Sequence, residues 1–283
     1  MDTMPTSNPT TSRTYSFADD APISLDLKNH SGDVVVLLDA PEGTAEVTLR
    51  TSRPLDLEPV VTSCHRGRVR VEIPALLGAD GSRGFAFSLG PISIGVGNER
   101  VDVEVHLPHG ADLAVSTKEG DIVVQGVSGL TEVRSGSGDL RVDETARLRA
   151  ATGSGDVTVG RCTGGSVTSG SGDIDIETAA GPDTLEVRTG SGDVSLADNR
   201  HDATVATGSG DISASHHHGS FTARTGTGDV DLAVPRRIPV WLDLTSGMGD
   251  VSRDLDPMGA PAEGQEHLSV TIRTGTGDIS VHH

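Results

Sequence analysis

The sequence predicts an all-β protein: a β-solenoid, similar to a β-helix, built from two-strand repeats of about 18 residues, with a β-rich N-terminal cap. Three observations predict this fold class. A corner of the form [Ser/Thr]-Gly-[Ser/Thr]-Gly-Asp recurs along the chain, it returns at a nearly constant interval, and the segments around it alternate apolar and polar residues. Because alternation with period 2 is typical of strands with one buried face, each interval holds two strands and two turns.

The pattern divides the chain into three regions. Residues 1–14 are polar, which predicts a disordered N-terminus. Residues 15–114 alternate less regularly and contain a first Ser-Gly-Asp corner at Asp33, which predicts the β-rich cap, either sandwich-like or made of degenerate rungs. An apolar, Gly-rich insert occupies residues 74–98 of this cap, and residues 115–283 form the predicted solenoid repeat domain.

The corner aspartates mark the rungs of the repeat domain. In this register the aliphatic residues point inward, together with the hydroxyl residue before the first Gly, so rungs stacked at about 4.8 Å would form hydroxyl ladders beside a narrow core. A series of antiparallel hairpins is the competing topology. Period and side-chain parity persist together through at least six repeats, which favours the solenoid. The corner aspartates are Asp121, Asp139, Asp156, Asp173, Asp193, Asp211, Asp229, Asp250 and Asp278.

These aspartates have a structural and a functional interpretation. The Gly before each Asp can adopt a positive φ, and the carboxylate can accept hydrogen bonds from nearby main-chain N–H groups. Such bonds, at roughly 1.5–3 kcal/mol each, are large enough to offset the repulsion between stacked carboxylates. We therefore predict a structural role and neither a metal site nor a cofactor, with calcium binding along the column as the alternative. The outward-facing Arg134, Arg188, Arg224 and Arg273 are predicted to form surface ion pairs.

The insert is the best candidate for an interaction site. It carries no charge from Gly84 through Asn98, and two short alternating segments flank Gly90-Pro91. This pattern predicts a hairpin whose apolar face either covers the core or is exposed and binds a partner. The predicted partner-binding residues are Phe85, Phe87, Leu89, Ile92 and Ile94.

The C-terminal strand offers a second route to association. Ile279–Val281 completes the last rung of the sequence, and no helical pattern follows it. The unpaired edge of a terminal strand favours pairing with another chain, whereas a strong negative charge opposes it. We therefore expect at most a weak homo-oligomer through this rung.

The charge balance excludes some partners. A formal net charge of −19 argues against binding to nucleic acid and disfavours binding to an anionic membrane surface, because proteins bind both of these polyanions mainly through Lys and Arg side chains. The two cysteines lie far apart, so no disulfide framework is implied. The N-terminal residues lack the apolar stretch of an export signal, and the expected location is the cytoplasm.

The sequence contains no recognisable catalytic motif. It has no phosphate loop, no HExxH, no CxxC and no GxSxG. The tract His216-His217-His218 is interpreted as a turn whose adjacent side chains are not spaced for one coordination sphere. The protein is therefore predicted not to be an enzyme, and a glycan-active β-helix enzyme is the least favoured alternative.

The strands ending in [Ser/Thr]-Gly-[Ser/Thr]-Gly-Asp, together with Leu107-Pro108 and the segment AVSTKEGDIVV, resemble the bacterial DUF4097 or "putative adhesin" family. The resemblance covers about Val101 to His283. It implies a β-solenoid of unsettled function. The residues and the resemblance together predict a non-catalytic scaffold or protein-interaction module that binds an unidentified protein, with an adhesin-like surface protein and a Ca²⁺-stabilised solenoid as alternatives.

Overall fold

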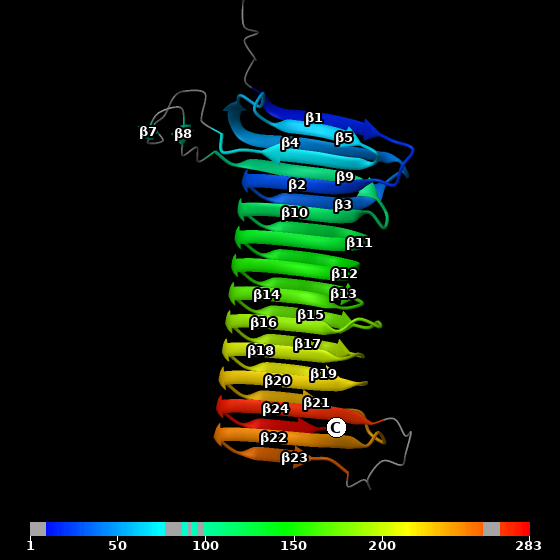
Figure 1. The fold of residues 1–283 in the computed structure, drawn as a ribbon, viewed down its shortest axis with the longest axis vertical. Coiled ribbons are helices and arrows are strands. Elements are labelled where there is room, and N and C mark those ends of the chain that lie inside the picture. The colour runs from blue at the N-terminus through cyan, green and yellow to red at the C-terminus, as the bar shows by residue number, and fades with distance from the viewer. Residues whose placement is uncertain (1–9, 77–86, 90–91, 95–98, 257–266) are drawn as a thin grey trace, which may run out of the picture. The chain divides into compact units, whose positions relative to one another are not determined.

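The computed structural model describes residues 10–76, 87–89, 92–94, 99–256 and 267–283. These residues form strands joined by turns, with no helix among them, so none of the described segments could cross a membrane as an apolar helix. Contacts divide the chain into two compact units, residues 1–129 with 133–137 and residues 130–132 with 138–283. Figure 1 shows the strands of both units.

The first unit is built around two Gly-Asp corners. Strands β2 and β3 form one rung through the corner at Asp33, and β10 and the start of β11 form the next through the corner at Asp121. The two rungs pair in parallel, strand on strand. The strands of this unit are β1 (Thr10–Ala18), β2 (Ser24–Ser31), β3 (Val34–Ala40), β4 (Thr44–Leu55), β5 (Val61–His65), β6 (Arg68–Ile73), β7 (Phe87–Leu89), β8 (Ile92–Ile94), β9 (Val101–Pro108), β10 (Asp112–Glu119) and β11 (Ile122–Ser137), of which residues 130–132 belong to the second unit.

A third rung of the first unit is assembled out of sequence order. Strand β6 pairs in parallel with β2, and β9 pairs in parallel with β3, so β2–β3 lies between β6–β9 and β10–β11. Strands β1, β4 and β5 are antiparallel additions, since β4 pairs with β9, β1 with β4, and β5 with β6. The cap therefore consists of degenerate rungs with antiparallel strands added. The insert leaves this unit where a corner would otherwise join β6 to β9.

Strand β1 begins inside the segment that was predicted to be disordered. Residues 10–14 pair with residues 48–55 of β4, and the ring of Tyr15 lies 5.2 Å from the guanidinium of Arg13. The prediction of disorder was wrong for these residues. Their order comes from pairing with a strand 34 to 45 residues away, which the polar composition of the segment does not reveal. Residues 1–9 lie outside the described part of the chain.

The second unit continues the rung pattern with high regularity. Strands on one face pair in parallel with the strand two positions on in the chain, and the corners align. The strands of this unit are β12 (Leu140–Ser154), β13 (Val157–Cys162), β14 (Gly165–Ser171), β15 (Ile174–Ala179), β16 (Leu185–Ser191), β17 (Val194–Asn199), β18 (Ala203–Ser209), β19 (Ile212–His216), β20 (Ser220–Thr227), β21 (Val230–Ala233), β22 (Val240–Met248), β23 (Val251–Asp254), β24 (Leu268–Thr276) and β25 (Ile279–His282).

The last two rungs of the second unit are exchanged in space. Strand β24 pairs with β20 on one side and β22 on the other, and β25 lies between β21 and β23 in the same way. The prediction that Ile279–Val281 presents an open edge was therefore wrong. The open edge belongs to β22 and β23, each of which pairs on one side only among the described residues. The reversal is visible in Figure 1, where β24 lies between β20 and β22.

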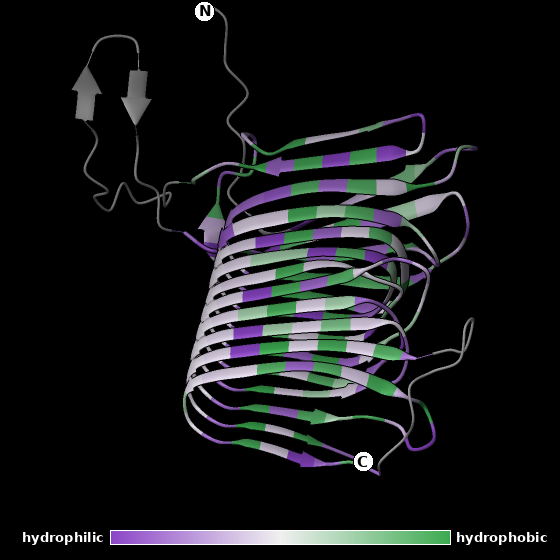
Figure 2. Cartoon of the chain, turned by 60° about the horizontal axis from the view of Figure 1, so that its bottom comes forward, coloured by the Kyte–Doolittle hydropathy of each residue, from purple (hydrophilic) through white to green (hydrophobic). Residues whose placement is uncertain are grey.

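The core is aliphatic and thin, as the composition predicts. Along many strands, hydrophobic and hydrophilic residues alternate (Figure 2), and the inward residues of the second unit include fully buried Leu148, Ile174, Leu185 and Ile272. Phe221 is the largest fully buried side chain. The predicted fold class, an all-β solenoid with a β-rich N-terminal cap, is confirmed.

Candidate interaction surfaces

The corner aspartates of the second unit form a continuous hydrogen-bonded ladder. In each corner, Oδ1 of the Asp accepts the main-chain N–H of the Asp in the neighbouring rung, with N···O distances of 2.7–2.9 Å. All seven bonds run in the same direction, so every carboxylate except the last has a main-chain donor. In spatial order the ladder is Asp139, Asp156, Asp173, Asp193, Asp211, Asp229, Asp278 and Asp250.

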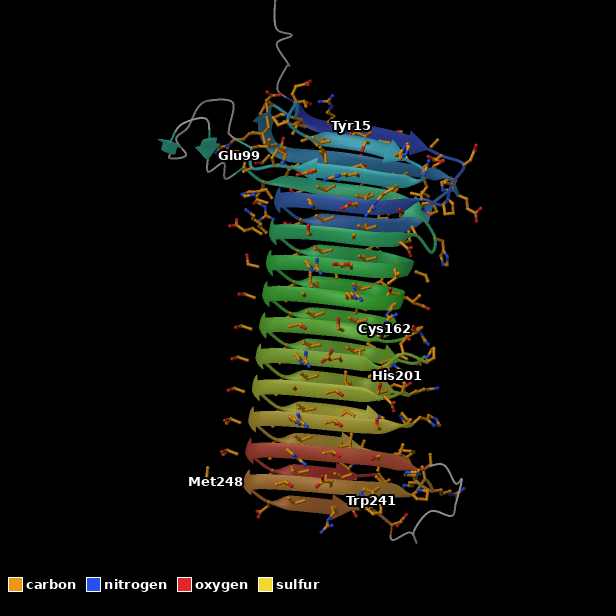
Figure 3. The ribbon with its side chains drawn as sticks, in the orientation of Figure 1. Tyr15, Glu99, Cys162, His201, Trp241 and Met248 are labelled. Carbon is orange, nitrogen blue, oxygen red and sulfur yellow. The ribbon has the colours of Figure 1, made fainter. Side chains whose placement is uncertain are left out.

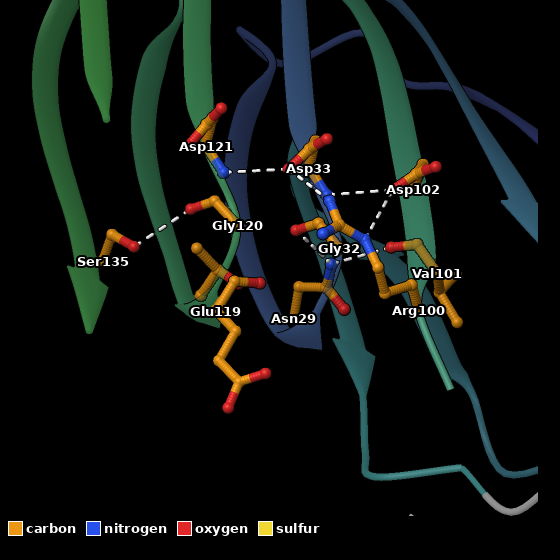
Figure 4. A network of polar contacts seen from close by, with 11 residues as sticks. Asn29, Gly32, Asp33, Arg100, Val101, Asp102, Glu119, Gly120, Asp121 and Ser135 are labelled. Carbon is orange, nitrogen blue, oxygen red and sulfur yellow. Dashed lines mark hydrogen bonds and ion pairs between the residues drawn. The ribbon is translucent and has the colours of Figure 1, made fainter. Parts of the chain in front are cut away.

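The same ladder in the first unit ends on an arginine (Figure 4). Asp121 N–H donates to Asp33 Oδ1 at 3.0 Å, and Asp33 N–H donates to Asp102 Oδ1 at 3.0 Å. The guanidinium of Arg100 binds Asp33 Oδ1 at 2.7 Å and lies 4.0 Å from Asp102 Oδ1. Arg100 therefore offsets part of the negative charge at this end of the ladder. No local sequence pattern predicts this contact, because Arg100 and Asp33 are 67 residues apart.

The hydroxyl column beside the ladder is also bonded between rungs. The Ser or Thr before the first Gly donates its hydroxyl to the carbonyl of the second Gly in the neighbouring rung, as in Thr207 to Gly192 at 3.1 Å. The hydroxyls form the predicted column, yet they bond to main-chain carbonyls instead of to one another. The equivalent donors are Ser135, Thr152, Ser169, Thr189, Thr225, Ser246 and Thr274.

Two of the four arginines predicted to form surface ion pairs, Arg188 and Arg273, have acidic partners on the strands. Arg188 pairs with Glu186, and Arg273 lies 3.5 Å from Asp243. Neither of these partners is a corner aspartate. Because these pairs are exposed, each contributes little to stability, with a typical value of about 0–1 kcal/mol.

A polar cluster is buried at the second turn of two consecutive rungs, after β17 and after β19. Asn199 Nδ2 donates to His216 Nδ1 at 2.7 Å and to the carbonyl of His201 at 2.8 Å, and the rings of His216 and Phe221 lie 5.3 Å apart. Asn199 and His216 are fully buried, and His201 is buried as well. Burial lowers the pKa of His216 to about 4. Within the described residues, no three His, Cys, Asp or Glu side chains converge as a metal site.

His216 differs from its sequence-based interpretation. It is the last residue of β19, and its side chain continues the inward phase of Ile212 and Ala214. The interpretation of the whole histidine tract as a turn was therefore wrong for this residue. The phase of the two aliphatic residues before it is a signal that could have placed it in the core.

The end rung β22–β23 exposes several large hydrophobic side chains. Trp241 and Met248, near the two ends of β22 (Figure 3), are each 68% exposed, and Val251 of β23 is 39% exposed. These are three of the five exposed large hydrophobic residues of the described chain. The inward Leu242 and Leu244 are half-buried.

The register explains this exposure. Leu242 and Leu244 align with Val270 and Ile272 of β24, both of which are fully buried. The two leucines therefore stand in the core column but have a neighbour on one side only. Sequence reasoning missed this surface because it took the last corner in the sequence for the last rung in space.

The family model described as Toastrack DUF4097 matches residues 78–283. The chain belongs to this family. The resemblance inferred from the corner motifs is thus confirmed. A search among curated proteins finds no match.

Solved structures similar to this Toastrack chain share little sequence with it. A "putative lipid binding protein" from Parabacteroides distasonis has a TM-score of 0.52 at 11% identity, covering 95% of this chain and 96% of its own. A "putative adhesin" from Bacteroides fragilis has a TM-score of 0.47 at 12% identity, with 96% and 98% covered. A "putative cell adhesion protein" from Clostridium sporogenes has a TM-score of 0.30 at 12% identity, with 96% and 99% covered. At these identities the Parabacteroides structure shows a shared fold alone.

The insert of this Toastrack chain contains the predicted hairpin. Strands β7 and β8 pair antiparallel, with Phe87 opposite Ile94 and Leu89 opposite Ile92, and they form a sheet of their own. Phe85 lies outside the described residues. The five predicted partner-binding residues thus remain a prediction, and the hairpin is a second candidate surface.

Proposed function

We propose that this chain is a non-catalytic protein-interaction module and that its docking edge is the end rung β22–β23. The observation that carries the proposal is the open edge of β22, where Trp241 and Met248 are exposed and two core leucines are half-buried. An extended segment of a partner can add a strand to such an edge: main-chain hydrogen bonds supply affinity, and side chains supply specificity.

The two strands of the rung differ in how readily each can pair with an additional strand. In β23, Arg253 aligns with the fully buried Val281 and so occupies the core column. A charge that points inward is one of the devices by which proteins block an edge strand. In β22 the only charged residue is Asp243, which points outward and pairs with Arg273. Strand β22 is therefore the edge that favours docking.

The corner ladder supports a role other than catalysis. Its carboxylates accept main-chain N–H groups, so they act as structural acceptors along the repeat. The names of the related structures, which describe adhesion and lipid binding, agree with a binding protein. We place the module in the cytoplasm; recovery of the native protein from washed cell envelopes instead of cytosol would favour an adhesin-like surface protein.

An affinity capture from the native organism tests this proposal. The baits are the intact chain, Leu244→Lys, the exposed Trp241→Glu and a deletion of residues 84–97. Thr222→Lys, on a strand paired on both sides, is the matched control. We expect a specific partner to be lost with both β22 variants and kept with the deletion and the control.

Other outcomes are equally informative. Loss with the deletion alone would move the docking site to the β7–β8 insert. A partner kept by all four variants, or no specific partner at all, would overturn the proposal. Circular dichroism of each bait separates loss of the docking edge from loss of the fold.

A further inference from the structure

We propose that a second copy of this chain occupies the β22 edge, paired antiparallel about a two-fold axis that passes through Leu244. The inference rests on the proposed function, since it names the partner of the same edge. Three properties of β22 support it: the direction of its main-chain groups, the register that this direction permits, and the side chains that the register brings together.

The main chain of β22 presents a free row of donors and acceptors. Leu268 N–H donates to the carbonyl of Pro239 at 2.9 Å, which fixes the odd-numbered residues at the start of β22 as those whose main-chain groups point toward β24. At the corner end of the strand this alternation changes, because the carbonyl of Met248 accepts the Gly277 N–H. Because consecutive residues of a strand direct these groups to opposite sides, Leu242 and Leu244 direct theirs to the open edge. A second strand can therefore bond at Leu244 as a hydrogen-bonded pair.

The two-fold axis restricts the register. Residues that face each other across an antiparallel pair lie on the same side of the sheet, so inward residues must meet inward residues for the two cores to align. Only axes that pass through a residue satisfy this condition. An axis through Leu244, the middle of Val240–Met248, places the strand opposite its own copy over its full length, with the main-chain bonds centred on Leu242–Ser246.

This register is complementary in its side chains. Leu244 meets its own copy, and Leu242 meets the second copy's Ser246. On the outward side Trp241 lies opposite the second copy's Gly247, whose missing side chain leaves room for the indole ring, an arrangement that favours aromatic residues beside strand glycines. The half-buried core column of one copy thus covers that of the other.

Registers shifted toward the start of β22 are less favourable. An axis through Asp243 places the two Asp243 carboxylates directly opposite each other, which is destabilising for like charges. An axis through Leu242 places Trp241 opposite Asp243 and leaves the second half of β22 unpaired. In the register centred on Leu244, Asp243 instead faces the second copy's Thr245.

The charge of the chain gives the dimer a distinctive salt dependence. A net charge of −19 on each copy opposes association, and salt screens that repulsion. One rung presents less surface than the roughly 800 Å² per partner of a standard interface, so the dimer is weak. We therefore expect the dimer to form more tightly at high salt, whereas an interface held by ion pairs would weaken.

Charge substitutions at Thr245 test the register with purified protein. Thr245→Lys places a cation opposite Asp243 twice, by symmetry, and Thr245→Asp places an anion there. At about 0.2–1 kcal/mol per cross-strand pair, sedimentation equilibrium should show roughly 2- to 30-fold tighter dimerisation for Lys and a similar weakening for Asp. Within one copy Thr245 aligns with Arg273, so the same variants should shift monomer stability in the opposite sense. Parallel changes in stability and dimerisation would contradict the register.

A disulfide reports the register directly. In a Cys64→Ser chain, whose other cysteine is buried, the pair Asp243→Cys and Thr245→Cys should form a covalent dimer on mild oxidation. Asp243→Cys alone should form no covalent dimer, because the two copies of residue 243 lie opposite each other only in a dimer whose two-fold axis passes through that residue. The fluorescence of Trp241, the single tryptophan, should shift to the blue with protein concentration.

The outcomes separate this inference from the proposed function. A chain that stays monomeric at high concentration and high salt overturns the inference, and a captured partner in that case leaves the proposed function standing. Dimerisation that responds to Thr245 and resists Thr222→Lys supports the inference, whether or not a heterologous partner is captured.

Discussion

Replacing His216 with Gln should remove a defined part of the acid sensitivity of the second unit. The imidazole is fully buried, it accepts a hydrogen bond from Asn199, and its pKa is lowered to about 4. Burial is the main cause of this lower pKa, and the charges of His217 and His201 add to it, whereas a main-chain hydrogen bond at Gly219 and the charge of Asp202 oppose it. Gln can keep the acceptor for Asn199 but cannot take up a proton.

The sign and the size follow from linkage. In the unfolded chain the histidine titrates at its ordinary pKa of 6.5, so between pH 6.5 and pH 4 the unfolded state binds more protons than the folded state. The contribution of neutral His216 to the free energy of unfolding is therefore fully present above pH 6.5 and is lost as the pH falls toward 4. At 1.36 kcal/mol per pKa unit, the loss is about 2 kcal/mol at pH 5 and about 3 kcal/mol at pH 4.

Urea denaturation at pH 7.5 and pH 5.0 measures this loss. The wild-type chain should lose about 2 kcal/mol more free energy of unfolding between the two pH values than His216→Gln does. The exposed His218, replaced by Gln, is the control and should keep the wild-type loss. If wild type and His216→Gln lose the same amount, the buried imidazole does not carry a lowered pKa and the reasoning fails.

Three further predictions concern the corners. Asp211→Ala removes the acceptor of the Asp229 N–H, and a hydrogen bond of this kind contributes roughly 1.5–3 kcal/mol. Because the substitution also relieves repulsion between carboxylates in the ladder, urea denaturation should show a net loss of about 1 kcal/mol in the free energy of unfolding. Asp211→Asn keeps the acceptor oxygen and should lose less stability; the opposite order would refute the acceptor role. Gly210→Ala would place a Cβ 2.1 Å from the Gly192 carbonyl oxygen, at a φ of +147°. The loss in free energy of unfolding, measured by urea denaturation, should therefore far exceed the loss of about 1 kcal/mol that is average for a substitution. The control Ser209→Ala, next to it in the chain, should be nearly neutral. Because main-chain donors already occupy the carboxylates, the melting temperature should agree within about 1 °C in calcium and in chelator; a rise of several degrees with calcium would revive the cation-bound solenoid.

Most of the second unit could be predicted because its rules are local. The second Gly of a corner needs a positive φ, and the strands beside it show their buried face through period-2 alternation. A corner such as Gly210-Asp211 contains both signals within a few residues. Neither signal depends on knowing which rung is the neighbour, so both could be found from the sequence alone.

The exchanged end rungs were not predictable by the same rules. The inward residues of β22 and β24 are interchangeable aliphatics, so the pattern says that each strand fits the core but not which rung each occupies. The longer spacings around Asp250 and the inward phase of Arg253 were signals that this rung differs. The contact of Arg100 with Asp33 and the pairing of residues 10–14 with β4 also depend on long-range proximity, which periodicity does not encode.

The exchange of the last two rungs sets an order of events for the growing polypeptide. The ribosome synthesises β22 and β23 before β24 and β25. In the nascent chain, β22 and β23 are therefore the first strands that can pair with the edge of β20 and β21, although in the final structure β24 and β25 lie between them and this edge. Both strand pairs carry a Gly-Asp corner and an aliphatic phase that fit this edge. The later pair must therefore either arrive before the earlier one docks or displace it. Synthesis rate and the segment that joins β23 to β24 thus become determinants of which arrangement forms.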